Sequence, residues 1–92
     1  MASKKDLKKD INYLIDEVIG TCLLHQYTQG QERQEELDGI ITEMIEFRDQ
    51  LIHRANHPEE KDGKLKGFYR SLYDELLEKV NGAFERISGS AE

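Results

Sequence analysis

Apolar residues recur along three stretches of the chain at the i, i+3, i+4 and i+7 spacing of a helix face. These stretches predict helices at about 4–28, 32–56 and 64–87. No stretch alternates apolar and polar residues in the manner of a half-buried β-strand. The pattern therefore predicts an all-α chain, with residues 1–92 forming a single helical domain.

Capping and turn residues separate the three predicted helices. Ser3 and Asp62 are suited to be the N-caps of the first and third helices. Gly30 and Gly89 favour helix ends, because glycine readily adopts the left-handed conformation that follows a last helical residue. Pro58 marks the end of the second helix. Since short turns join helices of similar length, we expect an antiparallel up-down-up three-helix bundle.

The first predicted helix carries more apolar residues than one buried face needs. Its core face holds Leu7, Ile11, Leu14, Ile15, Val18, Ile19 and Cys22. Tyr13, Leu24 and Tyr27 fall on the opposite side with Gly20 between them, and Leu23 lies at the margin. An apolar patch opposite the core marks association, and aromatic residues are favoured at interfaces.

Gly20 would allow another backbone to approach closely, although glycine within a helix costs about 1 kcal/mol relative to alanine. We therefore expect Tyr13, Gly20, Leu24 and Tyr27 to form an interface with a second copy of the chain or with another protein. The alternative is that the first helix tilts and the third helix covers part of this patch.

Arg48 interrupts the apolar stripe of the second helix, between Met44 and Leu51. A buried guanidinium without a partner is unfavourable by several kcal/mol and cannot lose its proton. We therefore expect Arg48 to pair, to reach solvent at the edge of the core, or to face a site. The pairing candidates are a carboxylate, Asp10 or Asp49, and the hydroxyl of Tyr69 or Tyr73.

The segment from Arg48 to His53 resembles the RxxxxH motif of HEPN-type proteins over six residues. Proteins of that type are all-helical and typically dimeric; many are metal-independent ribonucleases and others are inactive toxin partners. The resemblance implies that Arg48 binds and stabilises the phosphate and that His53 acts in proton transfer or contacts the phosphate, within a cleft between two subunits. The alternative is a structural ion pair at Arg48 and a solvated His53.

Two further residue pairs have spacings that occur in metal-binding or catalytic sites. His53 and His57 stand at i and i+4, as in metal-binding helices, and Glu60 could add an oxygen ligand. We nevertheless expect exposed histidines near a helix end and no metal. Cys22 and His25 could form a thiolate–imidazole pair, but we expect a packed thiol and a hydrogen-bonded histidine.

The net charge of –6, with acidic and basic residues interleaved, argues against a general nucleic-acid binder. Lys4, Lys5, Lys8 and Lys9 are expected to be a solvated helix end, the alternative being a phosphate contact. The acidic side chains of Glu43, Glu46, Asp74, Glu75 and Glu78 are expected to form a solvated surface. A lone Cys22 excludes an intrachain disulfide and a cysteine-based zinc site. No apolar run resembles a signal peptide or a membrane span, so we expect a cytoplasmic protein without a membrane partner.

These observations favour a small, non-enzymatic helical protein that acts by protein–protein association or self-association. We expect no cofactor, no metal and no small-molecule ligand. The alternative is a minimal HEPN-like ribonuclease or toxin-system component that uses Arg48 and His53 across a dimer cleft, which is the one interpretation that would require a nucleic-acid substrate.

Overall fold

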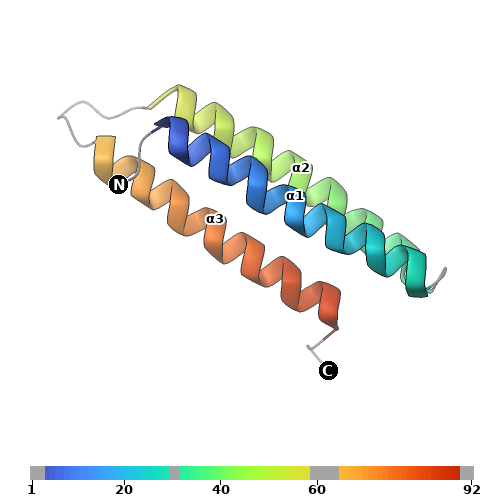
Figure 1. Cartoon of the computed structure of the whole chain (residues 1–92). Helices are drawn as coiled ribbons and strands as arrows, with labels where there is room; N and C mark the ends of the chain where they lie inside the picture. Colours follow the sequence, from blue (N-terminus) through green and yellow to red (C-terminus); the bar gives the residue numbers. More distant parts are fainter. Residues whose placement is uncertain (1–3, 30–31, 59–64, 90–92) are drawn as a thin grey trace.

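The computed structural model describes residues 4–29, 32–58 and 65–89, and these residues form three helices without a strand. The helices are α1 (Lys4–Gln29), α2 (Gln34–Asn56) and α3 (Leu65–Ser88) (Figure 1). The predicted all-α class is confirmed, and each predicted helix boundary lies within two residues of the observed one. The predicted caps Ser3, Asp62 and Gly30 lie outside the described residues.

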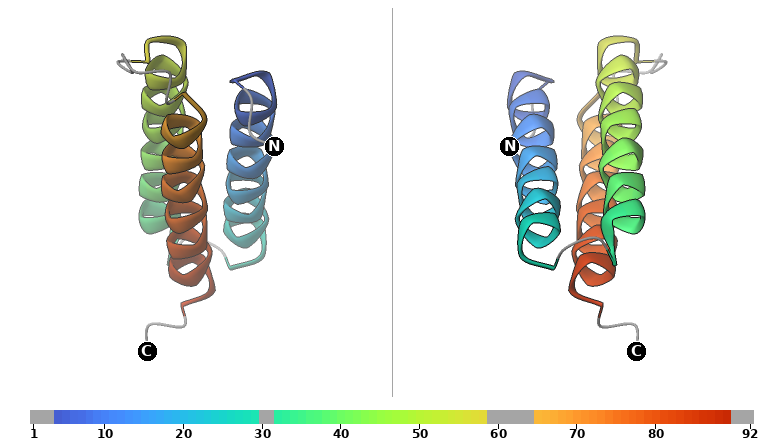
Figure 2. Two further views of the ribbon diagram at one scale, coloured as in Figure 1. Left: turned by 90° about the vertical axis from the view of Figure 1, so that its left-hand side faces the viewer. Right: turned by 90° about the vertical axis from the view of Figure 1, so that its right-hand side faces the viewer.

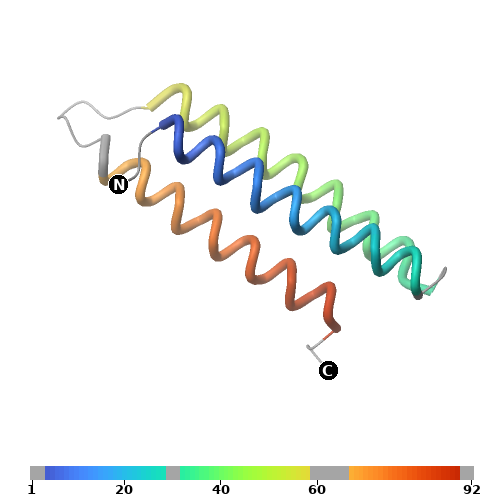
Figure 3. The backbone as a smooth tube through the Cα atoms, in the orientation of Figure 1, coloured from blue at the N-terminus to red at the C-terminus, as the bar shows by residue number. Residues whose placement is uncertain are grey.

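The three helices lie side by side, and consecutive helices run in opposite directions (Figure 3). At one end of the α1–α2 pair, Lys8 Nζ donates a hydrogen bond to Asn56 Oδ1 at 3.0 Å. At the other end, Gln26 Nε2 donates to Asp38 Oδ1 at 2.7 Å. The start of α1 therefore meets the end of α2, and the up-down-up bundle is confirmed.

Buried residues of all three helices meet in one core. In α1 the buried positions are four, four, three and four residues apart, which places them on one helix face. The fully buried α1 side chains are Leu7, Ile11, Ile15, Val18 and Cys22. The predicted core face of α1 is thus confirmed, with Leu14 and Ile19 half-buried at its margins.

The third helix lies along one side of the α1–α2 hairpin (Figure 2). It buries residues at the spacing predicted for its apolar face, among them Leu72, Leu76 and Ile87. At the end of α3, Gly89 adopts a φ of 71°, and its backbone N–H donates to the carbonyl oxygen of Arg86 at 3.2 Å. Gly89 therefore ends this helix as the sequence predicts.

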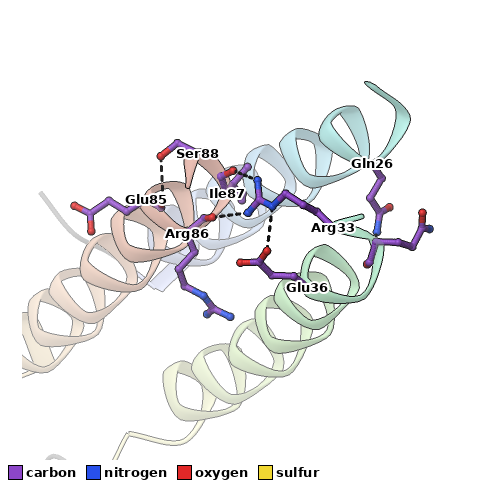
Figure 4. Close-up of polar contacts among 8 residues, drawn as sticks. Gln26, Arg33, Glu36, Glu85, Arg86, Ile87 and Ser88 are labelled. Carbon is purple, nitrogen blue, oxygen red and sulfur yellow. Dashed lines mark hydrogen bonds and ion pairs between the residues drawn. The ribbon is translucent and has the colours of Figure 1, made fainter. Parts of the chain in front are cut away.

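Arg33 connects the start of α2 to the end of α3 (Figure 4). Its guanidinium donates to the carbonyl oxygens of Ile87 at 2.6 Å and Arg86 at 2.8 Å, and its Nε donates to Glu36 at 3.0 Å. The last carbonyls of a helix lack partners within the helix, and a cation is favoured at that end of the helix dipole. Arg33 thus completes the C-terminus of α3 from another element, a role that the helical periodicity does not reveal.

We expect Arg33→Ala to lower the free energy of unfolding by about 1–3 kcal/mol, because two carbonyl groups would lose hydrogen bonds from a charged donor. The Arg33 side chain is 21% exposed, so water replaces these bonds incompletely. Urea unfolding followed by circular dichroism measures the change. Arg33→Lys is the matched control: it keeps the charge without the fork of donors and should give an intermediate loss. Equal unfolding midpoints for Arg33→Ala and the unsubstituted chain would contradict this role.

Candidate functional site

The side of α1 that faces away from the core carries an exposed apolar surface. Tyr13 is 62% exposed, Leu24 60% and Tyr27 87%, and Leu23 beside them is 53% exposed. These are four of the six large hydrophobic residues that are exposed in the described chain. The alternative in which α3 covers this patch is therefore wrong. We call the surface formed by Tyr13, Gly20, Leu23, Leu24 and Tyr27 the outer face of α1.

The regular helix explains why these residues share a surface. Tyr13, Gly20 and Tyr27 are seven residues apart, close to two helical turns, so they lie in a row along α1. The buried residues Val18 and Cys22 fall on the opposite side of the same turns.

Gly20 is not required by the packing of the single chain. A Cβ atom built at this position meets nothing within 4 Å, and the residue is exposed within a regular helix. Glycine there lowers helix stability by about 1 kcal/mol relative to alanine. Because Gly39, Gly67 and Gly82 are equally open, it is the exposed Tyr13, Leu24 and Tyr27 around Gly20 that make the outer face a candidate contact surface.

Arg48 lies at the edge of the core. Its side chain is 29% exposed, and its Nε is 3.7 Å from Oδ1 of the neighbouring Asp49, whose side chain is 70% exposed. Of the predicted partners, Asp49 is therefore the one in contact. Asp10 instead accepts a hydrogen bond from the Tyr73 hydroxyl at 2.6 Å, and this bond raises the pKa of Tyr73.

Arg48 and His53 do not come together within the described chain. Positions five residues apart on a regular helix point about 140° away from each other. The exposed His53 ring instead lies against the exposed His57 ring, with centroids 4.4 Å apart. The roles that the HEPN resemblance gives to Arg48 and His53 would need a second subunit.

The His53–His57 pair has no third ligand among the described residues. The Nδ1 atom of His57 lies 2.9 Å from the carbonyl oxygen of His53, so this nitrogen is engaged with the backbone. No group of three or more His, Cys, Asp or Glu residues in the described part of the chain could hold a metal ion. Glu60, the predicted oxygen ligand, lies outside the described residues.

Cys22 is a packed thiol rather than a nucleophile. It is fully buried, and burial raises the pKa of its thiol, with Arg33 and Arg86 opposing that shift more weakly. A raised pKa keeps the sulfur protonated near neutral pH, whereas nucleophilic cysteines are thiolates. His25, three residues further on, is half-buried.

An ionic cluster that the helical periodicity does not reveal joins α2 to α3. Glu43 accepts hydrogen bonds from Arg86 at 2.7 Å and Lys79 at 3.1 Å. Arg54 and Glu75 form two parallel bonds of 2.8 and 3.0 Å. The side chains of Glu43 and Glu75 are 41% and 42% exposed, so both lie at the surface as expected, but each is also paired with a cation of the facing helix. Glu46, Asp74 and Glu78 are exposed as expected.

This cluster borders an open groove of about 380 Å³ between α2 and α3. Both apolar and charged side chains line the groove, and Lys79 Nζ lies 5.5 Å from the centre of the Phe47 ring. The lining residues are Met44, Phe47, Glu75, Glu78, Lys79, Gly82, Ala83 and Arg86. Because Glu43 already pairs with Lys79 and Arg86, the groove does not offer an uncompensated positive charge.

Comparison with protein-family models, with curated proteins and with solved structures finds no match to this chain. The HEPN resemblance at Arg48 and His53 consequently stays a prediction. No helix in the described segments is long and apolar enough to cross a membrane. The outer face of α1 is the surface on which a functional proposal can be built from geometry.

The ionic cluster predicts a pH dependence of stability. Hydrogen bonds from Arg86 and Lys79 lower the pKa of Glu43 in the folded chain below its ordinary value near 4.5. A carboxyl group whose pKa is lower in the folded chain than in the unfolded chain stabilises the fold at pH values above its unfolded pKa. This stabilisation is lost as the pH falls through the pKa of the folded chain. We therefore expect Glu43→Gln to reduce the loss of stability between about pH 5 and pH 3.

Urea unfolding at a series of pH values measures this effect. Glu46→Gln is the matched control, since Glu46 is an exposed carboxylate on the same helix. The interpretation fails if Glu43→Gln and Glu46→Gln change the slope of stability against pH equally.

Proposed function

We propose that this protein acts by associating with protein through the outer face of α1, and not by catalysis. The observation that carries the proposal is the exposure of Tyr13, Leu24 and Tyr27, at 62%, 60% and 87%, on the side of α1 opposite the core. Single exposed apolar residues are common on protein surfaces. Three such residues beside Leu23, on one side of one helix, make a patch of the kind that marks interaction sites.

The chemistry of these side chains suits an interface. A large side chain contributes about 1.5–3 kcal/mol when it moves from water to full burial. Tyrosine presents a large rigid area with few rotatable bonds, and it is enriched among the residues that dominate binding energy. Covering Tyr13 and Tyr27 would therefore supply much of the free energy that a stable contact needs.

The candidate catalytic groups support the same proposal. Arg48 pairs with its neighbour Asp49, His53 lies against His57, and the thiol of Cys22 is buried. General acid–base catalysis requires groups held within hydrogen-bonding reach of one reacting centre. These residues do not converge on one centre within a single chain.

The variant Leu24→Glu/Tyr27→Glu tests the proposal. Both positions are exposed, so the fold should persist, while the new charges would be buried without partners in any complex. We expect loss of association, seen as a lower mass by light scattering after size exclusion or as loss of proteins captured from a cell extract. The matched control Ile45→Glu/Leu77→Glu alters exposed apolar residues on α2 and α3 and should leave association intact. If the α1 variant keeps both its mass and its captured proteins, the outer face is not the site.

The ribonuclease interpretation is the second candidate, since the side chains of Arg48 and His53 both reach solvent. It requires a dimer that brings two Arg48–His53 pairs into one cleft. Incubation of the purified protein with RNA, alongside Arg48→Ala and His53→Ala, tests it. Cleavage lost in both variants would support this candidate, whereas no cleavage by the unsubstituted dimer, or a monomer at every concentration, would rule it out.

A further inference from the structure

The outer face of α1 has the same pattern when it is read in either direction from Gly20. Tyr13 lies seven residues before Gly20 and Tyr27 lies seven residues after it, and both tyrosines are exposed. Seven residues of α-helix span about 10 Å. Two copies of α1 that cross at Gly20 in opposite directions would therefore place Tyr13 of each copy against Tyr27 of the other.

We propose that the occupant of the outer face is a second copy of this chain, packed antiparallel with the two α1 helices crossing at Gly20. This inference rests on the proposed function and names its partner. Each copy uses the same surface, so the contact is closed by a two-fold axis through the crossing point and adds no third copy.

The charges on α1 favour this antiparallel register. Asp16 and Leu24 are each four residues from Gly20, and Glu17 and Leu23 are each three residues from it. The antiparallel crossing thus sets each acid opposite a leucine of the other copy. The CH2 groups of the acid can pack against that leucine while its carboxylate reaches solvent at the edge of the contact. A parallel pairing in register would instead set Asp16 and Glu17 against their own copies, and like charges in that arrangement are destabilising.

The ends of the contact are also complementary in charge. Lys9 lies eleven residues before Gly20, so the crossing directs it toward the C-terminal end of α1 in the second copy, and Glu32 is the first described residue beyond that end. Lys9 and Glu32 are both exposed in the single chain. The two-fold axis produces this pairing twice, once at each end of the contact.

Gly20 is placed where the two backbones would come closest. The space above it is empty to at least 4 Å in the single chain. Figure 2 shows α1 at one side of the bundle, with α2 and α3 both on its other side. A second α1 can therefore approach without displacing either helix, and a glycine at the crossing allows the closest contact between helix backbones.

Gly20→Leu and Gly39→Leu form a matched pair that tests the crossing point. Both glycines are exposed within regular helices, and a Cβ at either position meets nothing within 4 Å. Both variants should remain folded, because leucine is the better helix former and a side chain meets nothing within the single chain at either position. We expect Gly20→Leu to weaken the dimer about tenfold or more by holding the backbones apart, and Gly39→Leu to leave it unchanged. Equal dimer dissociation constants for the two variants would overturn the crossing point.

Cysteine cross-linking tests the direction. A disulfide requires Cα atoms about 4.4–6.8 Å apart. Under mild oxidation, Gly20→Cys should link to itself, and a mixture of Tyr13→Cys and Tyr27→Cys should link to each other more than either links to itself. The unsubstituted chain, whose Cys22 is buried, is the control and should not link. Self-linking of Tyr13→Cys in preference to the mixed product would overturn the antiparallel register.

Light scattering separates this inference from the proposed function on which it rests. A dimer that Leu24→Glu/Tyr27→Glu dissociates supports both. If the protein is a monomer at all concentrations but still captures another protein through the outer face, the occupant is not a second copy. Association through this face would then still stand.

Discussion

Burial of one face of α1 is the constraint on which the rest of the structure depends. The five fully buried residues of α1 form an unbroken row, and both α2 and α3 pack against this helix. A helix packed on one face necessarily presents the other face to solvent. In α1 that second face carries exposed tyrosine and leucine side chains among its charged residues, and the proposed contact follows from this apolar surface.

Contacts between α2 and α3 are of a different kind. Polar side chains join the two helices through the Glu43 and Arg54 pairs, and Arg33 holds the end of α3 to the start of α2. Exposed ion pairs contribute little to stability individually. Their partners meet only when the two helices are shifted along their axes by one particular distance. The apolar row on α1 thus drives the helices together, while these polar contacts favour one position of α3 along the hairpin.

The helices, the core and the exposure of Tyr13, Leu24 and Tyr27 could be predicted from the sequence because periodicity is a property of one helix at a time. The partners of Arg33, Glu43 and Glu75 could not, because each depends on how far a second helix is shifted and rotated relative to the first. Arg48 had several predicted partners, and the sequence alone does not choose among them. In the packed structure Arg48 lies beside Asp49, while Asp10 accepts a hydrogen bond from Tyr73.

The contact between Arg33 and the end of α3 makes unequal demands on its two sides. Its acceptors are main-chain carbonyl oxygens of Arg86 and Ile87, and every amino acid supplies the same oxygen at those positions. The donor is a single guanidinium, for which no other side chain offers the same fork. The backbone acceptors therefore place little constraint on which amino acids stand at positions 86 and 87, whereas both hydrogen bonds depend on the identity of residue 33.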